Sequence, residues 1–330
     1  TDARGLLEHA HHGVPRLGEG YTTDDNARAL LYLSLLPEGA RDEGLVRTYL
    51  AFLLHMQTED GRFRNGLTLD GRFEDEGEAE DPTGRAVLAL AAAQRLPPPY
   101  AGPAREALLR ALPALEGFTS LRGRAYALLG LLALPKEPFL EAAEALGEGL
   151  LRAFREAEPA WPYPGPLTYA NHRPVEALYA YGLAFRRQEA VALARRALAF
   201  LKEHYFTPGE EGLFFDPVGN RFMARGRDKP LFDQQPIEAK CALLAHLRFG
   251  ERVLAEVAFL WFHGRNRLRA PLVDAFGPMD GLTPHGPNQN RGAEALLAYL
   301  LAWQALVQGV FPQVDEGVAL GRVFALGGRP

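Results

Sequence analysis

Cysteine and serine are nearly absent from this sequence of 330 residues, which contains one cysteine, Cys241, and two serines, Ser34 and Ser120. A single cysteine cannot form an internal disulfide bond or a cysteine-based zinc site, so nothing requires an oxidising compartment and we expect a cytoplasmic protein. Neither serine lies in a Gly-x-Ser-x-Gly motif, which excludes the hydrolases that use this nucleophile. No apolar run reaches the roughly 18 residues of a membrane span, so we expect no membrane partner.

The sequence also has no excess of positive charge. Its 36 lysines and arginines stand against 41 aspartates and glutamates, which gives a net charge of −5. Because nucleic-acid-binding proteins present a clustered excess of basic residues, we expect no nucleic-acid partner. Gly18-Glu19-Gly20 lacks the third glycine of a dinucleotide-binding motif, and the histidines of residues 9–12 lack a zinc-binding spacing. We therefore expect neither an organic cofactor nor a metal.

What the sequence does contain is an internal repeat. A polar cluster followed by an uncharged stretch rich in alanine and leucine recurs six times, at intervals of roughly 40 to 60 residues, the scale of a helical-hairpin repeat. The uncharged bodies, such as residues 87–93 and 295–303, predict helices that are buried nearly all round. The six stretches begin near Thr23, Asp81, Leu121, Asn171, Asp233 and Asn288.

Amphipathic segments alternate with these buried helices. Their apolar residues recur three and four positions apart, as in Leu45, Tyr49 and Phe52, which predicts helices with one buried face. The predicted segments are residues 42–57, 104–115, 138–156, 188–204 and 251–264, with residues 3–12 as a sixth.

Six buried and six half-buried helices bury every apolar face if they close into a ring, with the buried helices inside. We therefore predict an all-α fold, the (α/α)6 toroid, formed by one domain of residues 1–330 with residues 310–330 as a C-terminal tail. An open solenoid of helix pairs is the alternative architecture. In the toroid, the inner helices are parallel and their first residues meet at one mouth. Short β-hairpins are predicted in the mouth loops at residues 61–73, turning near Leu69-Asp70-Gly71, and at residues 212–222, turning near Pro217-Val218-Gly219-Asn220.

Four loop motifs resemble a known family. They are Tyr21-Thr22-Thr23-Asp24-Asp25-Asn26-Ala27-Arg28, Leu167-Thr168-Tyr169-Ala170-Asn171, Phe232-Asp233-Gln234-Gln235-Pro236 and the stretch from Asp280 to Asn290. They resemble a bacterial group in the six-hairpin glycosidase superfamily that occurs beside glycosyltransferases or fused to them. The resemblance covers nearly the whole chain, and it implies the (α/α)6 fold, an oligosaccharide or glycoside ligand, and a glycosyltransferase as a possible partner.

The mouth loops carry the acids that sugar hydrolysis requires. A glycosidase places two carboxyl groups across the scissile bond, about 5 Å apart for retention and about 6.5–9.5 Å apart for inversion. A helix cap needs only one carboxylate, so the adjacent acids Asp24 and Asp25 indicate a functional role, and their repulsion is expected to raise one pKa. Asp233 and Asp280 lie in loops dense with polar side chains and are the candidates for the opposing acid.

The candidate substrate-binding residues lie in the mouth loops or in the first turns of the inner helices. They offer a ring face or a polar group to a sugar. They are Tyr21, Asn26, Arg28, Arg85, Trp161, Tyr169, Asn171, His172, Phe232, Gln234, Gln235, Glu238, His285, Asn288 and Asn290.

Three functions are compatible with these residues. A glycoside hydrolase that uses the paired carboxylates is favoured. The first alternative is an enzyme resembling sugar epimerases or isomerases, with His172 and His285 moving a proton on and off a carbon atom. The second is a non-catalytic glycan-binding partner of a glycosyltransferase. Exchange of aspartate for asparagine at the mouth would inactivate the glycoside hydrolase, and exchange of histidine for asparagine would inactivate the epimerase or isomerase.

Overall fold

Six helices that are buried on nearly all sides alternate along the chain with five amphipathic helices. The computed structural model describes residues 1–134 and 136–310, and these residues contain eleven α-helices. The inner helices are α1 (Thr23–Leu35), α3 (Glu80–Ala92), α5 (Leu121–Leu131), α7 (His172–Ala184), α9 (Pro236–Arg248) and α11 (Ala293–Gln308). The outer helices are α2 (Glu43–Met56), α4 (Pro98–Leu115), α6 (Phe139–Glu156), α8 (Gln188–Tyr205) and α10 (Arg252–Leu260).

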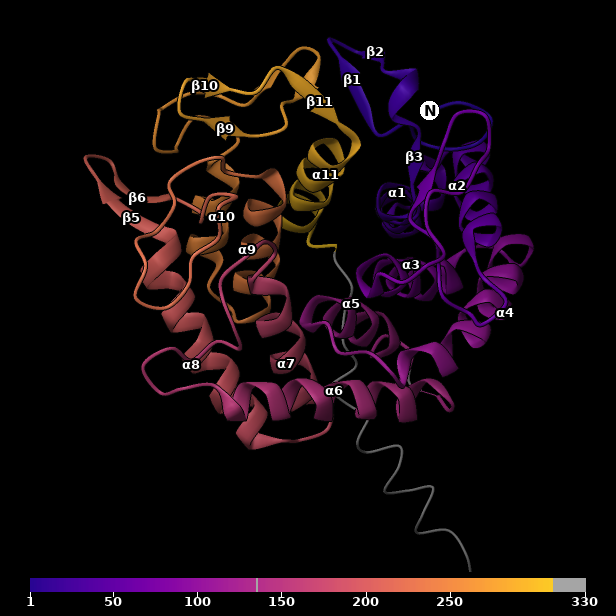
Figure 1. Ribbon diagram of the computed structural model, residues 1–330, viewed down its shortest axis with the longest axis horizontal. Coiled ribbons are helices and arrows are strands. Elements are labelled where there is room, and N and C mark those ends of the chain that lie inside the picture. The colour runs from indigo at the N-terminus through magenta and orange to yellow at the C-terminus, as the bar shows by residue number, and fades with distance from the viewer. Residues whose placement is uncertain (135, 311–330) are drawn as a thin grey trace, which may run out of the picture.

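The inner helices form a closed ring (Figure 1). Each inner helix packs against the next one, and α11 packs against α1. The outer helices cover this ring, with α2 against α1, α6 against α5 and α7, and α10 against α9 and α11. The predicted (α/α)6 toroid is therefore confirmed, and an open solenoid is excluded because the last inner helix contacts the first.

Local sequence explains where the inner helices begin. The Thr22 side chain caps α1 by accepting a hydrogen bond from the backbone N–H of Asp25, and Ser120 caps α5 in the same way through Gly123. Pro236 occupies the first position of α9, where its fixed φ suits a helix and its missing N–H is not needed. Each cap ends a polar loop at the mouth, so the polar loop residues and the first turns of the helices lie together.

Helices α3 and α5 approach each other closely because small residues lie at their contact. A Cβ atom added at Gly84 would lie 2.5 Å from the carbonyl oxygen of Gly123, and one added at Gly130 would lie 2.7 Å from the Cα atom of Leu88. Both distances are shorter than a van der Waals contact. The backbones of these two helices therefore touch directly, and only glycine fits at the contact.

The prediction of a helix at residues 3–12 is wrong. Instead, strand β1 (His9–His11) pairs with β2 (Val14–Pro15) and with β11 (Asn290–Gly292), and the backbone N–H of Ala293 donates to the carbonyl of Glu8. The segment is extended because it pairs on one side with the adjacent β2 and on the other with β11, about 280 residues away in the chain. The predicted tail at residues 310–330 lies outside the described residues except for Val310, so the tail and the single domain stay predictions.

Short strands and 3-10 helices occupy the connecting loops. The predicted turn at Leu69-Asp70-Gly71 is confirmed, because the N–H of Gly71 donates to Thr68 and Leu67 forms a bridge with Phe73. The other predicted hairpin is misplaced, since the hairpin turns at Glu210 and Glu211. The strands are β3 (Tyr21–Thr22) with β4 (Gly66–Leu67), β5 (Phe206–Gly209) with β6 (Gly212–Phe215), β7 (Val273–Asp274) with β8 (Gly277–Pro278), and β9 (Leu282–Thr283) with β10 (Gly286–Pro287). The 3-10 helices are η1 (Leu17–Glu19), η2 (Glu38–Ala40) and η3 (Ala93–Arg95). None of the helices in the described part of the chain is long and apolar enough to cross a membrane.

Candidate functional site

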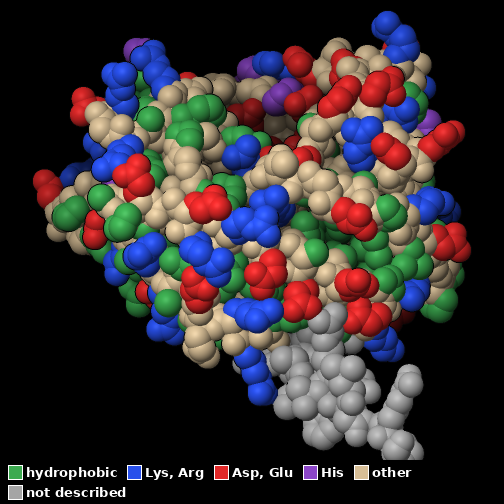
Figure 2. Space-filling model, turned by 60° about the horizontal axis from the view of Figure 1, so that its bottom comes forward, with side chains coloured by type: hydrophobic (Ala, Val, Ile, Leu, Met, Phe, Trp, Pro, Cys, Tyr) green, Lys and Arg blue, Asp and Glu red, His purple; other side chains and the backbone are tan. Residues whose placement is uncertain are grey.

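A polar cavity of about 410 Å³, which we call the mouth cavity, lies where α1, α9 and α11 begin. All four predicted catalytic acids line it, and Figure 2 shows acidic and histidine side chains around a hollow near the upper edge of the face in view. Its charged lining residues are Glu8, His9, Asp24, Asp25, Arg28, Asp233, Asp280 and Glu294. Its neutral polar lining residues are Thr22, Asn65, Asn220, Gln234, Gln235, Thr283 and Asn288. Loops from distant parts of the sequence therefore place six carboxyl groups around one cavity.

Asp25 is the most deeply buried of these acids, with 3% of its surface exposed. It accepts a hydrogen bond of 2.6 Å from Nη1 of Arg28 and one of 3.0 Å from the hydroxyl of Thr22. Burial raises the pKa of Asp25 to about 6, with Glu294 and Asp24 adding to the shift and Arg28 opposing it. A raised pKa was expected in this pair, but burial contributes more to it than the neighbouring carboxylate does.

Two arginines bind the neighbouring acids Glu294 and Asp24. Arg28 donates from Nη2 to Oε2 of Glu294 at 2.6 Å, so it joins α1 to α11. Arg85 of α3 donates from Nη1 to Oδ2 of Asp24 at 2.5 Å. The other oxygen of Asp24, Oδ1, has no hydrogen-bond partner among the described residues.

Asp280 has the opposite protonation preference from Asp25. Burial alone would raise its pKa, but the contact with His9, the backbone N–H of Gly292 and the amide of Asn290 outweigh burial and lower the pKa. In return, the neighbouring carboxylate of Asp280 raises the pKa of His9, whose Nδ1 lies 3.6 Å from Oδ2 of Asp280. Asp280 is therefore held as a carboxylate, and His9 gains affinity for a proton.

Glu8 and His9 are functional candidates that the sequence reasoning did not select. A helix was predicted at residues 3–12, whereas the structure has strand β1 there, and this strand with the residue before it places His9 and Glu8 at the cavity. Burial raises the pKa of Glu8, and Asp24 is one of the acids that add to this shift. Asp233 accepts a hydrogen bond of 3.3 Å from the amide of Asn220.

The sequence carries no short-range signal for the pairing of β1 with β11, so Glu8 and His9 could not be placed at the cavity from the sequence.

Several predicted binding residues instead hold the loops together. The buried Tyr21 donates its hydroxyl proton to Asp2, and the buried Asn26 bonds to the backbone of Leu6 and Thr22. The amide of Asn171 donates to the hydroxyl of Tyr205 at 2.7 Å. None of these three predicted residues lines the mouth cavity, because loop anchoring turns their side chains into the protein.

The predicted aromatic residues also lie away from the mouth cavity. Trp161 lines a separate groove with Tyr163 and Arg225, and its indole N–H donates to the carbonyl of Gly165. The hydroxyl of Tyr169 donates to Oδ2 of Asp81 at 2.8 Å. Phe232 is half-buried and packs against the core. The expectation that aromatic faces line the cavity therefore does not hold for these residues.

The two histidines of the epimerase hypothesis are not brought to the cavity. His172 is fully buried, with its ring 5.7 Å from that of His246, and burial lowers its pKa well below the usual value. His285 is exposed at the turn between β9 and β10. His9 is the histidine that lines the mouth cavity.

The remaining predicted binding residues differ in position. Glu238 is fully buried in the first turn of α9, where it accepts from the backbone N–H of Ala170, and burial raises its pKa to about 8. Gln235 and Asn288 line the mouth cavity, and Asn290 lies beside it against Asp280. Gln234 also lines it, although its side chain is held by other residues. It donates to Asp216 at 2.8 Å and accepts from the indole N–H of Trp261 at 2.9 Å.

No group of three or more histidine, cysteine, aspartate or glutamate side chains in the described residues is arranged to hold a metal ion. The acids at the mouth are instead partnered by arginine, histidine, amide and hydroxyl groups. This arrangement is suited to binding a polar ligand and to transferring protons at different points around it.

No protein-family model and no curated protein matches the sequence. Solved structures do resemble the fold. D-mannose isomerase matches with a TM-score of 0.66 and 11% identity over 94% of this chain and 93% of that chain. Cellobiose 2-epimerase from Bacillus thermoamylovorans matches with a TM-score of 0.66 and 9% identity, over 92% of each chain.

A glycoside hydrolase family 76 α-mannanase from Bacteroides thetaiotaomicron matches with a TM-score of 0.58 and 10% identity, over 93% of this chain and 88% of that chain. Identities this low show a shared fold and leave the chemistry open. They establish the six-hairpin (α/α)6 architecture that the loop motifs imply.

Proposed function

We propose that the protein acts on carbohydrate and is a glycoside hydrolase whose active site is the mouth cavity. The observation that carries this proposal is the presence, in one cavity, of carboxyl groups with opposite protonation preferences. Burial raises the pKa of Asp25 to about 6, while the contacts of Asp280 lower its pKa. Glycoside hydrolysis needs one carboxyl group that holds a proton and a second one that is ionised.

The roles follow from these environments. Asp25 is the proposed general acid, which protonates the leaving oxygen of the glycosidic bond. Asp280 is the proposed base or nucleophile, kept ionised by His9, Asn290 and the N–H of Gly292. Asp24 and Asp233, with Glu8 beside them, are proposed to bind sugar hydroxyls through free oxygen atoms. Gln235 and Asn288 are proposed to do the same through their amides.

Activity measurements on Asp25→Asn test the assignment of the acid. The variant is expected to lose about 10²–10⁴-fold in kcat on oligosaccharides, the usual contribution of a general acid. On dinitrophenyl glycosides it should lose far less, because that leaving group departs without a proton. Asp280→Asn should lose activity on both substrates. Asp228→Asn, an exposed residue outside the cavity, is the matched control and should keep wild-type activity.

The pH profile provides a second measurement of the same assignment. Above a pKa of about 6, Asp25 of the free enzyme is ionised and cannot donate a proton, so kcat/KM should fall as the pH rises through this value. The fall should disappear in Asp25→Asn. Equal losses on both substrate types, with an unchanged pH profile, would exclude Asp25 as the acid. Sugar binding without turnover in the wild-type protein would favour the glycan-binding partner of a glycosyltransferase.

A sugar epimerase or isomerase is the second candidate function. It is supported by His9, a histidine whose pKa is raised by Asp280 in the mouth cavity, and by fold neighbours that are named as an isomerase and an epimerase. In this case His9 would remove a proton from a sugar carbon. Proton exchange between a free sugar and deuterated water, lost in His9→Asn and kept in Asp25→Asn, would favour this function over hydrolysis.

A further inference from the structure

A second cavity lies inside the ring, further along the inner helices than the mouth cavity. We call it the lumen cavity. Every inner helix contributes to its wall, through Arg28, Arg85, Tyr126, Arg173, Lys240 and Leu301 in chain order. Its volume is about 20 Å³, which accommodates roughly one particle of the size of a water molecule. Arg28 lines both cavities, so the lumen cavity lies directly behind the acidic mouth.

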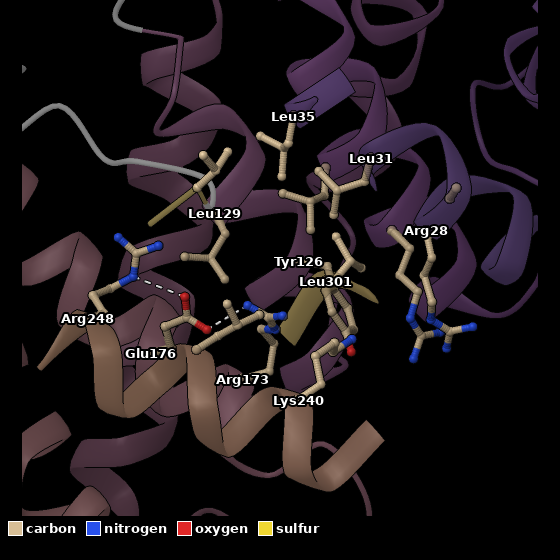
Figure 3. Close-up of a pocket in the computed structure, with 15 residues that line it drawn as sticks. Arg28, Leu31, Leu35, Tyr126, Leu129, Arg173, Glu176, Lys240, Arg248 and Leu301 are labelled. Carbon is tan, nitrogen blue, oxygen red and sulfur yellow. Dashed lines mark hydrogen bonds and ion pairs between the residues drawn. The ribbon is translucent and has the colours of Figure 1, made fainter. Parts of the chain in front are cut away.

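Several polar atoms of the residues that line the lumen cavity are hydrogen-bond donors that lack an acceptor. The Nε atoms of Arg28, Arg85 and Arg173 and the hydroxyl of Tyr126 are buried and have no hydrogen-bond partner in the part of the chain that the structure describes. Lys240 is only 2% exposed and has no hydrogen bond or ion pair there either. Figure 3 shows Lys240, Arg173 and Tyr126 pointing toward one another.

The carboxylates nearby are already engaged by other donors. Asp25, Glu294 and Asp24 bind the terminal Nη atoms of Arg28 and Arg85. Glu176, which lines the lumen cavity, accepts from Nη1 of Arg173 at 2.6 Å and from Nε of Arg248 at 3.0 Å.

The ammonium group of Lys240 therefore belongs to a buried side chain and has no countercharge among the described residues. Burial lowers the pKa of Lys240 to about 8, and Arg173, Arg28 and Arg85 lie close enough to contribute in the same direction.

The chemistry of these groups restricts what the cavity can bind. Lysine and arginine have no acceptor atoms, so a ligand must accept hydrogen bonds from several directions at once. A buried cation is costly unless it is paired, so the ligand must also carry negative charge. Leu31, Leu129 and Leu301 form apolar walls, and the small volume favours a ligand of one or a few atoms. A monatomic anion satisfies all of these conditions.

We propose that the lumen cavity is a binding site for one small halide ion, such as chloride, held by Lys240, Tyr126 and the guanidinium groups of Arg28, Arg85 and Arg173. The site balances the charge of Lys240 and ties the inner helices together at the centre of the ring. The proposal does not rest on the reaction proposed at the mouth, although Arg28 lines both cavities.

Thermal unfolding in matched salts tests the proposal. At constant ionic strength and pH 7, replacing sodium gluconate by sodium chloride or bromide up to 200 mM is expected to raise the Tm of the wild-type protein saturably, by about 2–4 °C. Gluconate is too large for the cavity. The Lys240→Met variant should lose this difference between salts, while Lys202→Met, which removes an exposed lysine from α8, should keep it.

Crystals of the wild-type protein grown in bromide give an independent measurement. An anomalous peak is expected between Nζ of Lys240 and the hydroxyl of Tyr126, whatever the folding of the variants. Equal Tm values in chloride and gluconate together with no peak at this position would overturn the proposal. A bromide peak that persisted in Lys240→Met crystals would also overturn it, because the lysine would then not hold the ion.

Discussion

Side chains of one chemical type have different proton affinities in this protein, because the chain brings different neighbours to them. Asp25 is enclosed beside Arg28 and Glu294, whereas Asp280 lies beside His9 and accepts hydrogen bonds from Asn290 and the backbone N–H of Gly292. The sequence identifies these acids through their positions at the starts of inner helices. It does not reveal their burial or partners, because those partners come from segments up to 280 residues away.

Glu238 offers a test at the residue scale. Its pKa in the folded protein is about 8, above the ordinary value of 4.5, so the folded state keeps a proton that the unfolded chain releases. The stabilisation from this group is complete below pH 4.5 and is lost as the pH rises through 8. Glu238→Gln, which keeps the acceptor oxygen for Ala170, should therefore be more stable than wild type at pH 8, on the order of 2 kcal/mol.

Urea unfolding at pH 5 and pH 8 measures this difference. The expected result is that the wild-type protein loses more stability between the two values than Glu238→Gln does. Glu59→Gln, at an exposed site, is the control and should follow the wild-type protein. If all three proteins change in parallel with pH, the carboxyl group of Glu238 is ionised in the folded state.

At the scale of the elements, periodicity predicted helices well and strands poorly. The starts of the inner helices were predicted because a polar cap, such as Thr22 or Ser120, precedes an uncharged body. The hairpin at residues 206–215 was misplaced because Pro217 and Gly219 gave stronger turn signals than the actual turn at Glu210 and Glu211. The pairing of β1 with β11 is a long-range contact, which local patterns cannot reveal.

The contact between α3 and α5 makes a prediction about packing. Gly130→Ala would place a Cβ atom 2.7 Å from the Cα atom of Leu88, so the helices must move apart. We expect a loss of about 1–3 kcal/mol of unfolding free energy, in the range of overpacked cores. Gly102→Ala, in α4, meets no atom within 4 Å of the new Cβ apart from its chain neighbours, but Pro103 crowds that Cβ and offsets the gain in helix propensity, so the stability should stay within about 1 kcal/mol of wild type.

Denaturant unfolding of both variants separates packing from helix propensity, because both add one methyl group to a helix. A stabilised Gly130→Ala protein would mean that the helices are not in direct contact.

At the scale of the whole molecule, the extended N-terminal segment links the last and the first inner helix, because β1 pairs with β11 and the N–H of Leu6 donates to Asn26 of α1. Asn26 fixes this segment, since its side chain accepts from the N–H of Leu6 and donates to the carbonyls of Leu6 and Thr22. Asn26→Ala should release the segment, so that trypsin cleaves after Arg4 faster than in wild type, at a cost of about 1–3 kcal/mol in stability. Gln188→Ala, at an exposed position of α8, is the control for the added alanine.

Mass spectrometry of a time course with trypsin measures the rate of this cleavage. Equal rates in Asn26→Ala and in wild type would show that other contacts, such as the pairing of β1 with β11, are enough to hold the segment.

Arg28 lines both the mouth cavity and the lumen cavity, and this has a consequence for a ligand bound in either cavity. If its guanidinium group moves to contact a ligand in one cavity, the hydrogen-bond donors that it presents to the other cavity move as well. Reciprocity of coupling free energies then requires that a sugar and a halide change each other's affinity by the same factor. The choice of counter-ion in the buffer would thus set the sugar dissociation constant, and the sugar concentration would set how tightly the salt is held.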